Sequence, residues 1–165
     1  MDGIKKRQGK IRMKNKMRVE FDAKSVNEGF ARVTAAAFIT QLDPTLDEVA
    51  DIKTAVSEAV TNAIIHGYEG GEGTVCLSCM LEENTAVITV EDKGVGMADV
   101  QKAMEPFYTT KPELERSGMG FAFMEAFMDD MQVESKAGEG TKVILTKKIG
   151  VREEENQDGC GDSSY

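Results

Sequence analysis

The sequence predicts an α/β fold, a two-layer sandwich in which helices cover one face of a mixed, mostly antiparallel sheet. A chain of 165 residues is long enough for one domain with a substantial core. Segments with alternating apolar residues and segments with helical spacing follow one another in the order β-α-α-β-β-α-β-β. The strands expected at 74–81 and 86–91 are separated by only four residues, which is typical of an antiparallel hairpin. Together these features favour strands that pair mostly antiparallel, with the helices gathered on one side.

The first strand and the first helix are expected before Pro44. Residues 17–21 alternate between apolar and polar side chains, which predicts a strand. Ser25 and Glu28 have the S-x-x-E spacing of a capping box, so they predict the start of a helix that ends before the proline. The apolar residues with helical spacing behind this box are Phe30, Val33, Ala37, Phe38 and Leu42.

A second helix begins with a second capping box. Thr45 and Glu48 provide this box, and Gly67 is expected to end the helix. The apolar stripe between them consists of Val49, Ile52, Val56, Ala59, Val60, Ala63 and Ile64. A glycine cluster at 70–73 then predicts a turn before the hairpin.

After the hairpin, glycines and charged residues interrupt the pattern. Residues 105–117 predict a loop, and loops of this length usually serve a function. The remaining elements are predicted as a short helix at 98–104, a helix at 119–130, and strands at 132–135 and 141–147.

Charge is distributed unevenly along the chain. The formal net charge is −9, yet residues 1–18 carry eight basic side chains against one acidic one, a local charge of +7. We expect a flexible basic extension at 1–16, one folded domain at 17–148 and a disordered acidic tail at 149–165.

The same composition excludes several classes of protein. Nucleic-acid-binding proteins usually present a basic face to phosphates, which an acidic body does not offer. No segment is long and apolar enough for a membrane span, and no apolar region follows the basic start as in a secretion signal. We therefore expect a cytoplasmic protein with no membrane partner and no direct contact with nucleic acid.

Glu58 and Asn62 lie four residues apart in the second helix, so their side chains point to one spot opposite the apolar stripe. A carboxylate can accept a proton or orient a nucleophile. A carboxamide oxygen is a neutral ligand suited to Mg²⁺ that is shared with phosphate oxygens. The simpler interpretation of the pair is a solvated polar helix face.

Asp92, Gly94 and Gly96 form an Asp-x-Gly-x-Gly motif where the second strand of the hairpin ends. The carboxylate can accept a hydrogen bond from an exocyclic amine such as that of adenine. The glycines allow the backbone to approach a flat ligand. A tight turn after a strand would have the same sequence, so the motif alone leaves both interpretations open.

A glycine-rich segment, Ser117–Gly120, stands where the long loop enters a helix. Backbone N–H groups at such a helix start could hold phosphates, with Lys111 and Arg116 available for the terminal one. A glycine-rich helix cap without a ligand is the alternative. The only histidine, His66, lies in the last turn of the second helix, where a structural role is expected.

Taken in order, four segments resemble the sequence boxes of a known ATPase superfamily. They are Glu58–Asn62, Asp92–Gly96, Ser117–Gly120 and Gly140–Thr141, which resemble the N, G1, G2 and G3 boxes shared by gyrase, Hsp90, histidine kinases and MutL. The resemblance implies the Bergerat-type ATP-binding fold, and it makes the folded domain a kinase and ATP-binding domain.

Carried over box by box, the resemblance implies the cofactors ATP and Mg²⁺. Glu58 is then the general base, Asn62 binds Mg²⁺ and Asp92 recognises adenine. The other residues implied to contact the nucleotide are Gly94 and Gly96 around the pocket, Thr141 at the adenine, and, in the long loop and at the helix start, Thr109, Thr110, Lys111, Arg116, Ser117, Gly118, Met119 and Gly120.

Two longer stretches, Glu58–Tyr68 and Phe107–Phe121, resemble the sporulation anti-sigma factors that are small serine kinases. This resemblance implies a homodimer that binds and inhibits a sigma factor and phosphorylates its anti-anti-sigma antagonist on serine. It also places a partner surface at Glu28 and Arg32, for which a simple surface ion pair is the alternative.

The runner-up function is an ATP-gated module that sequesters the sigma factor without phosphotransfer. Such a module would need the ATP-binding residues but no general base. The presence of Glu58 therefore favours the kinase.

Overall fold

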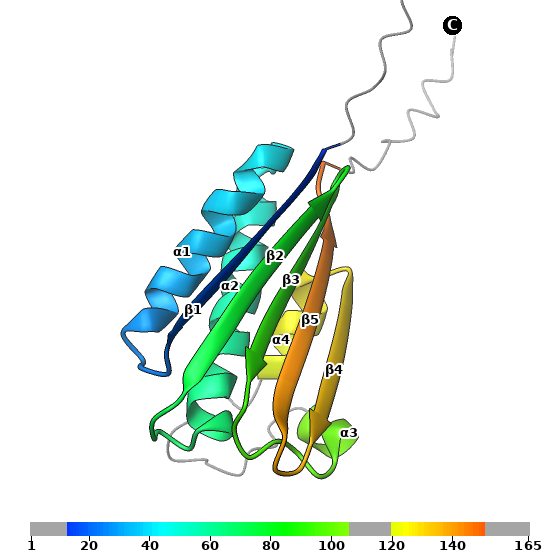
Figure 1. The fold of residues 1–165 in the computed structure, drawn as a ribbon. Coiled ribbons are helices and arrows are strands. Elements are labelled where there is room, and N and C mark those ends of the chain that lie inside the picture. The colour runs from blue at the N-terminus through cyan, green and yellow to red at the C-terminus, as the bar shows by residue number, and fades with distance from the viewer. Residues whose placement is uncertain (1–12, 106–119, 151–165) are drawn as a thin grey trace, which may run out of the picture.

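The computed structural model describes residues 13–105 and 120–150. The elements in chain order are β1 (Lys14–Asp22), α1 (Asn27–Ile39), η1 (Thr40–Leu42), α2 (Leu46–Asn62), η2 (Ala63–Gly67), β2 (Thr74–Glu82), β3 (Thr85–Asp92), α3 (Val100–Ala103), α4 (Gly120–Phe127), β4 (Asp130–Lys136) and β5 (Gly140–Lys148). Figure 1 shows α1, α2 and α4 on one face of a five-stranded sheet. The predicted two-layer α/β sandwich is therefore confirmed.

The sheet has the strand order β1-β2-β3-β5-β4, and each neighbouring pair is antiparallel. The expectation of a mixed sheet is wrong for the described strands. β4 runs in the same direction as β3, but β5 turns back from β4 and enters the sheet between the two. Because β5 lies between them, the parallel strands β3 and β4 are not neighbours. This order depends on pairing between segments far apart in the chain, which no local sequence pattern encodes.

The folded body extends further at both ends than the expected limits 17–148. β1 begins at Lys14, inside the segment 1–16 expected to be flexible, because its first residues pair with the last residues of β2. At the other end Ile149 is buried, and its N–H donates to the carbonyl oxygen of Asn84 at 2.7 Å. Residues 1–12 of the expected extension and 151–165 of the expected tail lie outside the described part of the chain.

The first helix, α1, forms without the expected capping box. Its N-cap is Val26, which makes no side-chain capping bond, and the Glu28 carboxylate pairs with Arg32 instead. The residues that α1 buries are Ala31, Ala35, Ala36 and Ile39. Phe30 and Val33, which helped to predict the helix, are 53% and 55% exposed. The small alanines allow α1 to approach α2 closely, and this leaves the larger apolar side chains on the outer face.

The second helix begins as predicted. The Glu48 N–H donates to the Thr45 hydroxyl at 3.1 Å, and the Thr45 N–H donates to the Glu48 carboxylate at 3.0 Å, so the capping box is confirmed. The helix continues beyond α2 as the π-helical turn η2, which ends at Gly67. The predicted end of the helix is therefore also confirmed.

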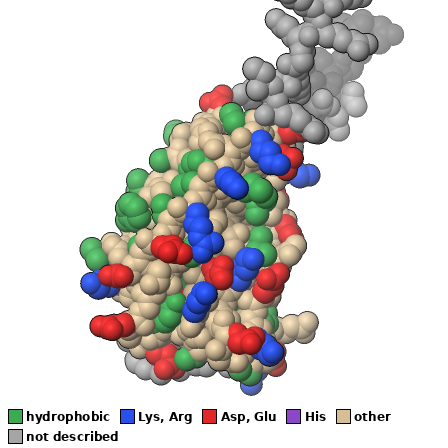
Figure 2. Space-filling view, viewed as in Figure 1, with side chains coloured by type: hydrophobic (Ala, Val, Ile, Leu, Met, Phe, Trp, Pro, Cys, Tyr) green, Lys and Arg blue, Asp and Glu red, His purple; other side chains and the backbone are tan. Residues whose placement is uncertain are grey.

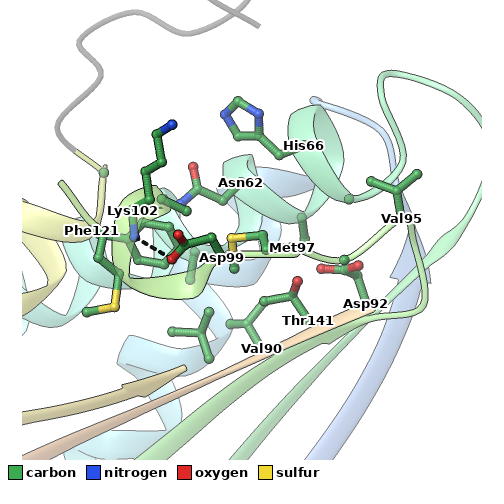
Figure 3. Close-up of a pocket in the computed structure, with 18 of the residues that line it drawn as sticks. Asn62, His66, Val90, Asp92, Val95, Met97, Asp99, Lys102, Phe121 and Thr141 are labelled. Atoms are coloured by element: carbon green, nitrogen blue, oxygen red, sulfur yellow. Dashed lines mark hydrogen bonds between the residues drawn. The ribbon is translucent and has the colours of Figure 1, made fainter. Parts of the chain in front are cut away.

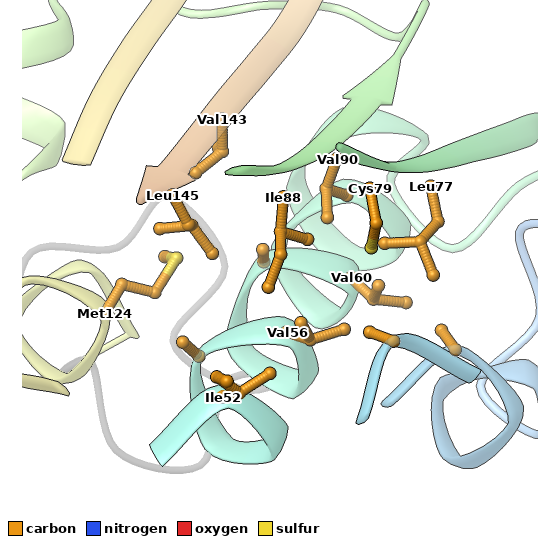
Figure 4. Packing of buried hydrophobic residues seen from close by; sticks show 14 of the residues in the cluster. Ile52, Val56, Val60, Leu77, Cys79, Ile88, Val90, Met124, Val143 and Leu145 are labelled. Atoms are coloured by element: carbon orange, nitrogen blue, oxygen red, sulfur yellow. The ribbon is translucent and has the colours of Figure 1, made fainter. Parts of the chain in front are cut away.

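The core lies between α2 and the inner face of the sheet, and Figure 4 shows how its side chains meet. Large side chains that are fully buried there include Ile52, Val56, Val60, Leu77, Ile88, Met124 and Leu145. Burying each such side chain contributes about 1.5–3 kcal/mol to stability. This packing fixes the rotation of α2, and with it the direction of the polar face that carries Glu58 and Asn62.

The last helix, α4, ends at Phe127, earlier than the predicted 119–130. The following residues already belong to the sheet: the Asp129 N–H donates to the Thr146 carbonyl oxygen at 2.9 Å, and Asp130 is paired with Thr146. Asp129 and Asp130 therefore bond to the neighbouring strand, although their local sequence is compatible with a helix.

The sheet face that the helices leave uncovered is seen in Figure 2. Basic and acidic side chains are interspersed on it, so this face does not concentrate the acidic excess of the chain. No helix in the described ranges is long and apolar enough to cross a bilayer.

Candidate functional site

A cavity of about 570 Å³ lies between α2 with η2, the segment that follows β3, and the start of α4. Pockets for small organic ligands have volumes of roughly 300–1,000 Å³. The strands β3 and β5 contribute Val90, Asp92 and Thr141 to its wall, while Asn62 comes from the helix side (Figure 3). Polar groups from the sheet and from the helix layer therefore meet around one space of suitable size.

Asp92 is only 5% exposed although it stands at the end of a strand. One carboxylate oxygen, Oδ1, accepts a hydrogen bond from the Gly94 N–H at 2.9 Å. Burial raises the pKa of this carboxyl, and hydrogen bonds from the backbone of Gly94 and Thr141 oppose that effect only in part. Because Asp92 also lines the cavity, it can accept a hydrogen bond from an N–H donor of a ligand.

Thr141 lines the cavity and is held by Ser135, a residue that the sequence analysis missed. The two hydroxyl oxygens are 2.8 Å apart. Ser135 also donates to the carbonyl oxygen of Gly140 at 3.0 Å and accepts from the Met97 N–H at 2.8 Å. Ser135 and Thr141 face each other across the β4–β5 pair, so the register of that pair is the signal that could have found it.

The two glycines of the Asp-x-Gly-x-Gly motif are each required for a steric reason. A Cβ on Gly94 would overlap the carbonyl group of Gly67. Gly96 has a φ of 65°, and a Cβ there would overlap the carbonyl group of Lys136. The loop therefore closes against η2 on one side and against the end of β4 on the other.

Glu58, Asn62 and Gly120 lie together where α2 meets the first residue of α4. A Cβ on Gly120 would be 3.1 Å from Glu58 Oε2 and 3.3 Å from both Oδ1 and Nδ2 of Asn62. Asn62 and Gly120 line the cavity, and both Glu58 and Asn62 are partly buried. The pair is therefore covered by α4 and is not a fully solvated helix face.

The predicted contacts of the long loop lie outside the described residues and stay predictions: Thr109, Thr110, Lys111, Arg116, Ser117, Gly118 and Met119. His66, for which the sequence indicates a structural role, lines the cavity. Lys102 and Phe121 also line it, and the sequence analysis missed both.

A second feature lies on α1, away from the cavity. Arg32 donates to both carboxylate oxygens of Glu28, at 3.0 and 3.1 Å, so the expected ion pair is present. Three apolar side chains are exposed on this helix and its N-cap: the N-cap Val26 at 81%, Phe30 at 53% and Val33 at 55%.

Comparison with known families agrees with this arrangement. Residues 19–147 match the model of the histidine kinase-like ATPase domain. The solved structure of the RsbU and RsbW domains of a Mycobacterium tuberculosis protein matches with a TM-score of 0.58 at 20% identity, covering 82% of this chain and 32% of that one, which shows a shared fold. Fold and site therefore define an ATP-binding domain of the histidine kinase-like class.

Curated relatives narrow this class. The chain is 56% identical over 142 residues to the anti-sigma F factor of Clostridium acetobutylicum, covering 86% of this chain and 99% of the relative. It is 61% identical over 138 residues to that of Clostridium perfringens, covering 83% and 99%. It is 59% identical over 138 residues to that of Bacillus licheniformis, covering 83% and 94%. The chain belongs to this family as one of the anti-sigma F factors.

Proposed function

We propose that this protein is an ATP-dependent serine kinase that binds and inhibits sigma F and phosphorylates the anti-anti-sigma antagonist of that factor. Membership of the anti-sigma F factors supports the proposal. The observation that carries it is the position of Glu58 and Asn62 against Gly120, beside the cavity that Asp92 also lines. A base, a metal ligand and an adenine acceptor thus serve one site, and phosphoryl transfer depends mainly on such positioning.

The nucleotide is proposed to lie along the cavity. Its adenine amine donates to the buried Asp92 carboxylate, with Thr141 beside it. Its phosphates lie near Asn62 and Gly120. The residues of the long loop and helix start that the family resemblance implies, from Thr109 to Met119, complete the phosphate contacts.

The residues at this site fit a Mg²⁺ ion that is bound together with ATP. In the ranges 13–105 and 120–150, no group of three or more His, Cys, Asp or Glu side chains could hold a metal ion alone. Mg²⁺ usually takes one or two protein oxygens and completes its shell with water and substrate phosphates. The Asn62 carboxamide oxygen, beside Gly120 in the cavity wall, is a donor of this kind. Bound there, Mg²⁺ would neutralise part of the negative charge of the ATP phosphates.

Glu58 is proposed to accept the proton of the attacking serine hydroxyl. Its carboxylate lies against the first residue of α4, the helix that the phosphate-binding segment enters. A base at this point is close to the place where the γ-phosphate and the incoming hydroxyl must meet.

Partner proteins are proposed to dock on α1. The Glu28–Arg32 pair offers charged groups, and the exposed side chains of Val26, Phe30 and Val33 offer apolar contact area. The net charge of −9 favours a partner with a basic surface. We propose a homodimer as the assembled form.

The proposed function is tested by replacing Glu58 and measuring phosphate transfer from Mg-ATP to the serine of the antagonist. Loss of a general base should slow transfer by about 10²–10⁴-fold while ATP affinity changes little. Glu82→Ala, at the exposed end of β2, removes a carboxylate elsewhere and should transfer at the wild-type rate. A Glu58→Ala variant as fast as wild type would contradict the assignment of the base. A wild-type protein that captures sigma F in an ATP-dependent way without transfer would indicate the sequestering module.

A further inference from the structure

The cavity wall is rich in acidic side chains, although the proposed ligand is itself an anion. The acidic residues that line it in the described part of the chain are Glu69, Asp92, Asp99 and Glu105. Apart from His66, the only basic residue among its described lining residues is Lys102. The acidic side chains of this wall repel the phosphates of the ligand. A polyphosphate bound here therefore needs a positively charged group close by.

The backbone of Lys102 is held in place by Asp99. Asp99 is the N-cap of α3, and its Oδ1 accepts a hydrogen bond from the Lys102 N–H at 3.0 Å. The capping bond orients the short helix, so the lysine side chain starts from a defined position in the cavity wall. Figure 3 shows this side chain extending on the Asn62 side of the cavity, away from Asp92 and Thr141.

We infer that Lys102 is a nucleotide-binding residue, with its ammonium group contacting the phosphates of ATP. This inference rests on the proposed function, since it uses Asp92 for adenine and Asn62 for the phosphate end. Lys102 lies outside the four sequence boxes and before the long loop, so it is not one of the motif residues. It adds a cation to the phosphate end from α3, which precedes the long loop in the sequence, whereas α4 follows it.

If Lys102 contacts the phosphates, the affinity lost when it is replaced should depend on the number of phosphates in the ligand. An ammonium at the phosphate end strengthens binding in proportion to the negative charge that it meets, so its loss affects ATP most, ADP less and adenosine not at all. A lysine that only stabilised the fold of α3 would affect all three ligands alike.

Isothermal titration calorimetry of the full chain with ATP, ADP and adenosine, each with Mg²⁺, tests the inference. We expect Lys102→Gln to weaken ATP binding by about 10-fold and Lys102→Glu by more, with adenosine affinity unchanged. Lys102→Arg, which keeps the charge, should stay within about twofold of wild type. Lys16→Glu, on the exposed edge strand β1, is the control for a change of net charge and should leave all three affinities as they are.

Raising the salt concentration gives a second measurement. ATP affinity of the wild type should fall more steeply with salt than that of Lys102→Gln, because a charge contact has been removed from the variant. Unchanged ATP affinity in Lys102→Gln, or an equal loss for adenosine and ATP, would overturn the inference.

The outcome is separable from a failure of the proposed function. If Asp92→Asn binds adenosine as well as the wild type does, the adenine site is wrongly placed and the proposed function fails at that point. If Asp92→Asn weakens adenosine binding and Lys102→Gln leaves ATP binding unchanged, the site stands and only the role of Lys102 is wrong.

Discussion

Gly94 packs directly against the carbonyl group of Gly67. A Cβ on Gly94 would overlap that carbonyl, and the neighbouring Val95 N–H donates to the same oxygen at 2.8 Å. A Cβ on Gly67 would in turn lie 2.7 Å from Asp92 Oδ1. The end of the second helix, the loop after β3 and the buried carboxylate are thus fitted to one another without space for a side chain.

Gly94→Ala should therefore damage both the fold and the site. The added methyl group must push the loop away from Gly67, and we expect a loss of about 1–3 kcal/mol in the free energy of unfolding, together with weaker ADP binding. Urea unfolding and calorimetry measure the two effects. Gly29→Ala in α1 is the control, because its Cβ would meet only an Arg32 nitrogen at 4.0 Å. The control should be neutral or stabilising by up to about 1 kcal/mol, and equal losses in both variants would contradict this account.

Asp92 predicts how adenosine binding depends on pH. Burial raises the pKa of its carboxyl above the ordinary 3.8, so the group gains a proton at a higher pH than an exposed aspartate does. The ionised form is the acceptor for the adenine amine, so adenosine affinity should fall as the pH is lowered through this raised pKa.

Adenosine is the suitable ligand for this titration because it has no phosphate groups to titrate. Asp92→Asn should bind adenosine about 10-fold more weakly at neutral pH and show a flatter pH profile. An unchanged profile in the variant would assign the pH dependence to another group.

Glu48 predicts a pH-dependent contribution to stability. Its carboxylate accepts from the Thr45 N–H at 3.0 Å and from the Gly150 N–H at 3.0 Å, which ties the residues that follow β5 to the start of α2. Partial burial raises its pKa, but the hydrogen bonds from Thr45 and Gly150 together outweigh burial, so the pKa lies below the ordinary 4.5. Glu48→Ala should lower the free energy of unfolding by about 1–2 kcal/mol at neutral pH.

The sign of the pH effect follows from linkage. A carboxylate whose pKa is lowered by folding stabilises the protein above its ordinary pKa, and this contribution is lost as the pH falls through the lowered value. The difference between wild type and Glu48→Ala should therefore shrink in acid. Asp47→Ala removes a neighbouring first-turn acid and should have the smaller effect. A difference that is constant from neutral pH to strong acid would contradict the capping role.

Replacing Arg32 should affect partner binding without affecting nucleotide binding. It lies on α1 and is not part of the cavity wall, so Arg32→Ala should weaken capture of sigma F by about 10-fold and leave ADP affinity unchanged. Arg18→Ala is a matched control, since Arg18 also pairs with a glutamate at 3.0 Å, but on the sheet. Equal capture by wild type and Arg32→Ala in a co-purification assay would remove α1 from the partner surface.

Local chemistry made much of this protein predictable from its sequence. The box of Thr45 and Glu48 forms because its hydrogen bonds join residues three apart, and Glu58 meets Asn62 because four residues make about one helical turn. The hairpin of β2 and β3 likewise depends on strands joined by a short turn. In each case the interacting groups are close in the chain, so the pattern of residues is sufficient.

The tertiary structure decided what depends on distant residues. Ser25 and Glu28 have the same spacing as the second box, yet the Glu28 carboxylate is taken by Arg32 and no box forms. The close contact of Gly94 with Gly67 depends on how α2 packs on the sheet. The presence of Lys102 in the cavity wall depends likewise on where α3 lies against the rest of the fold. By itself, then, the sequence determined the class of protein, the helices and strands, and the chemistry of the motif residues. The arrangement of those groups around one cavity was decided by long-range packing, because residues far apart in the chain become neighbours only when the layers assemble.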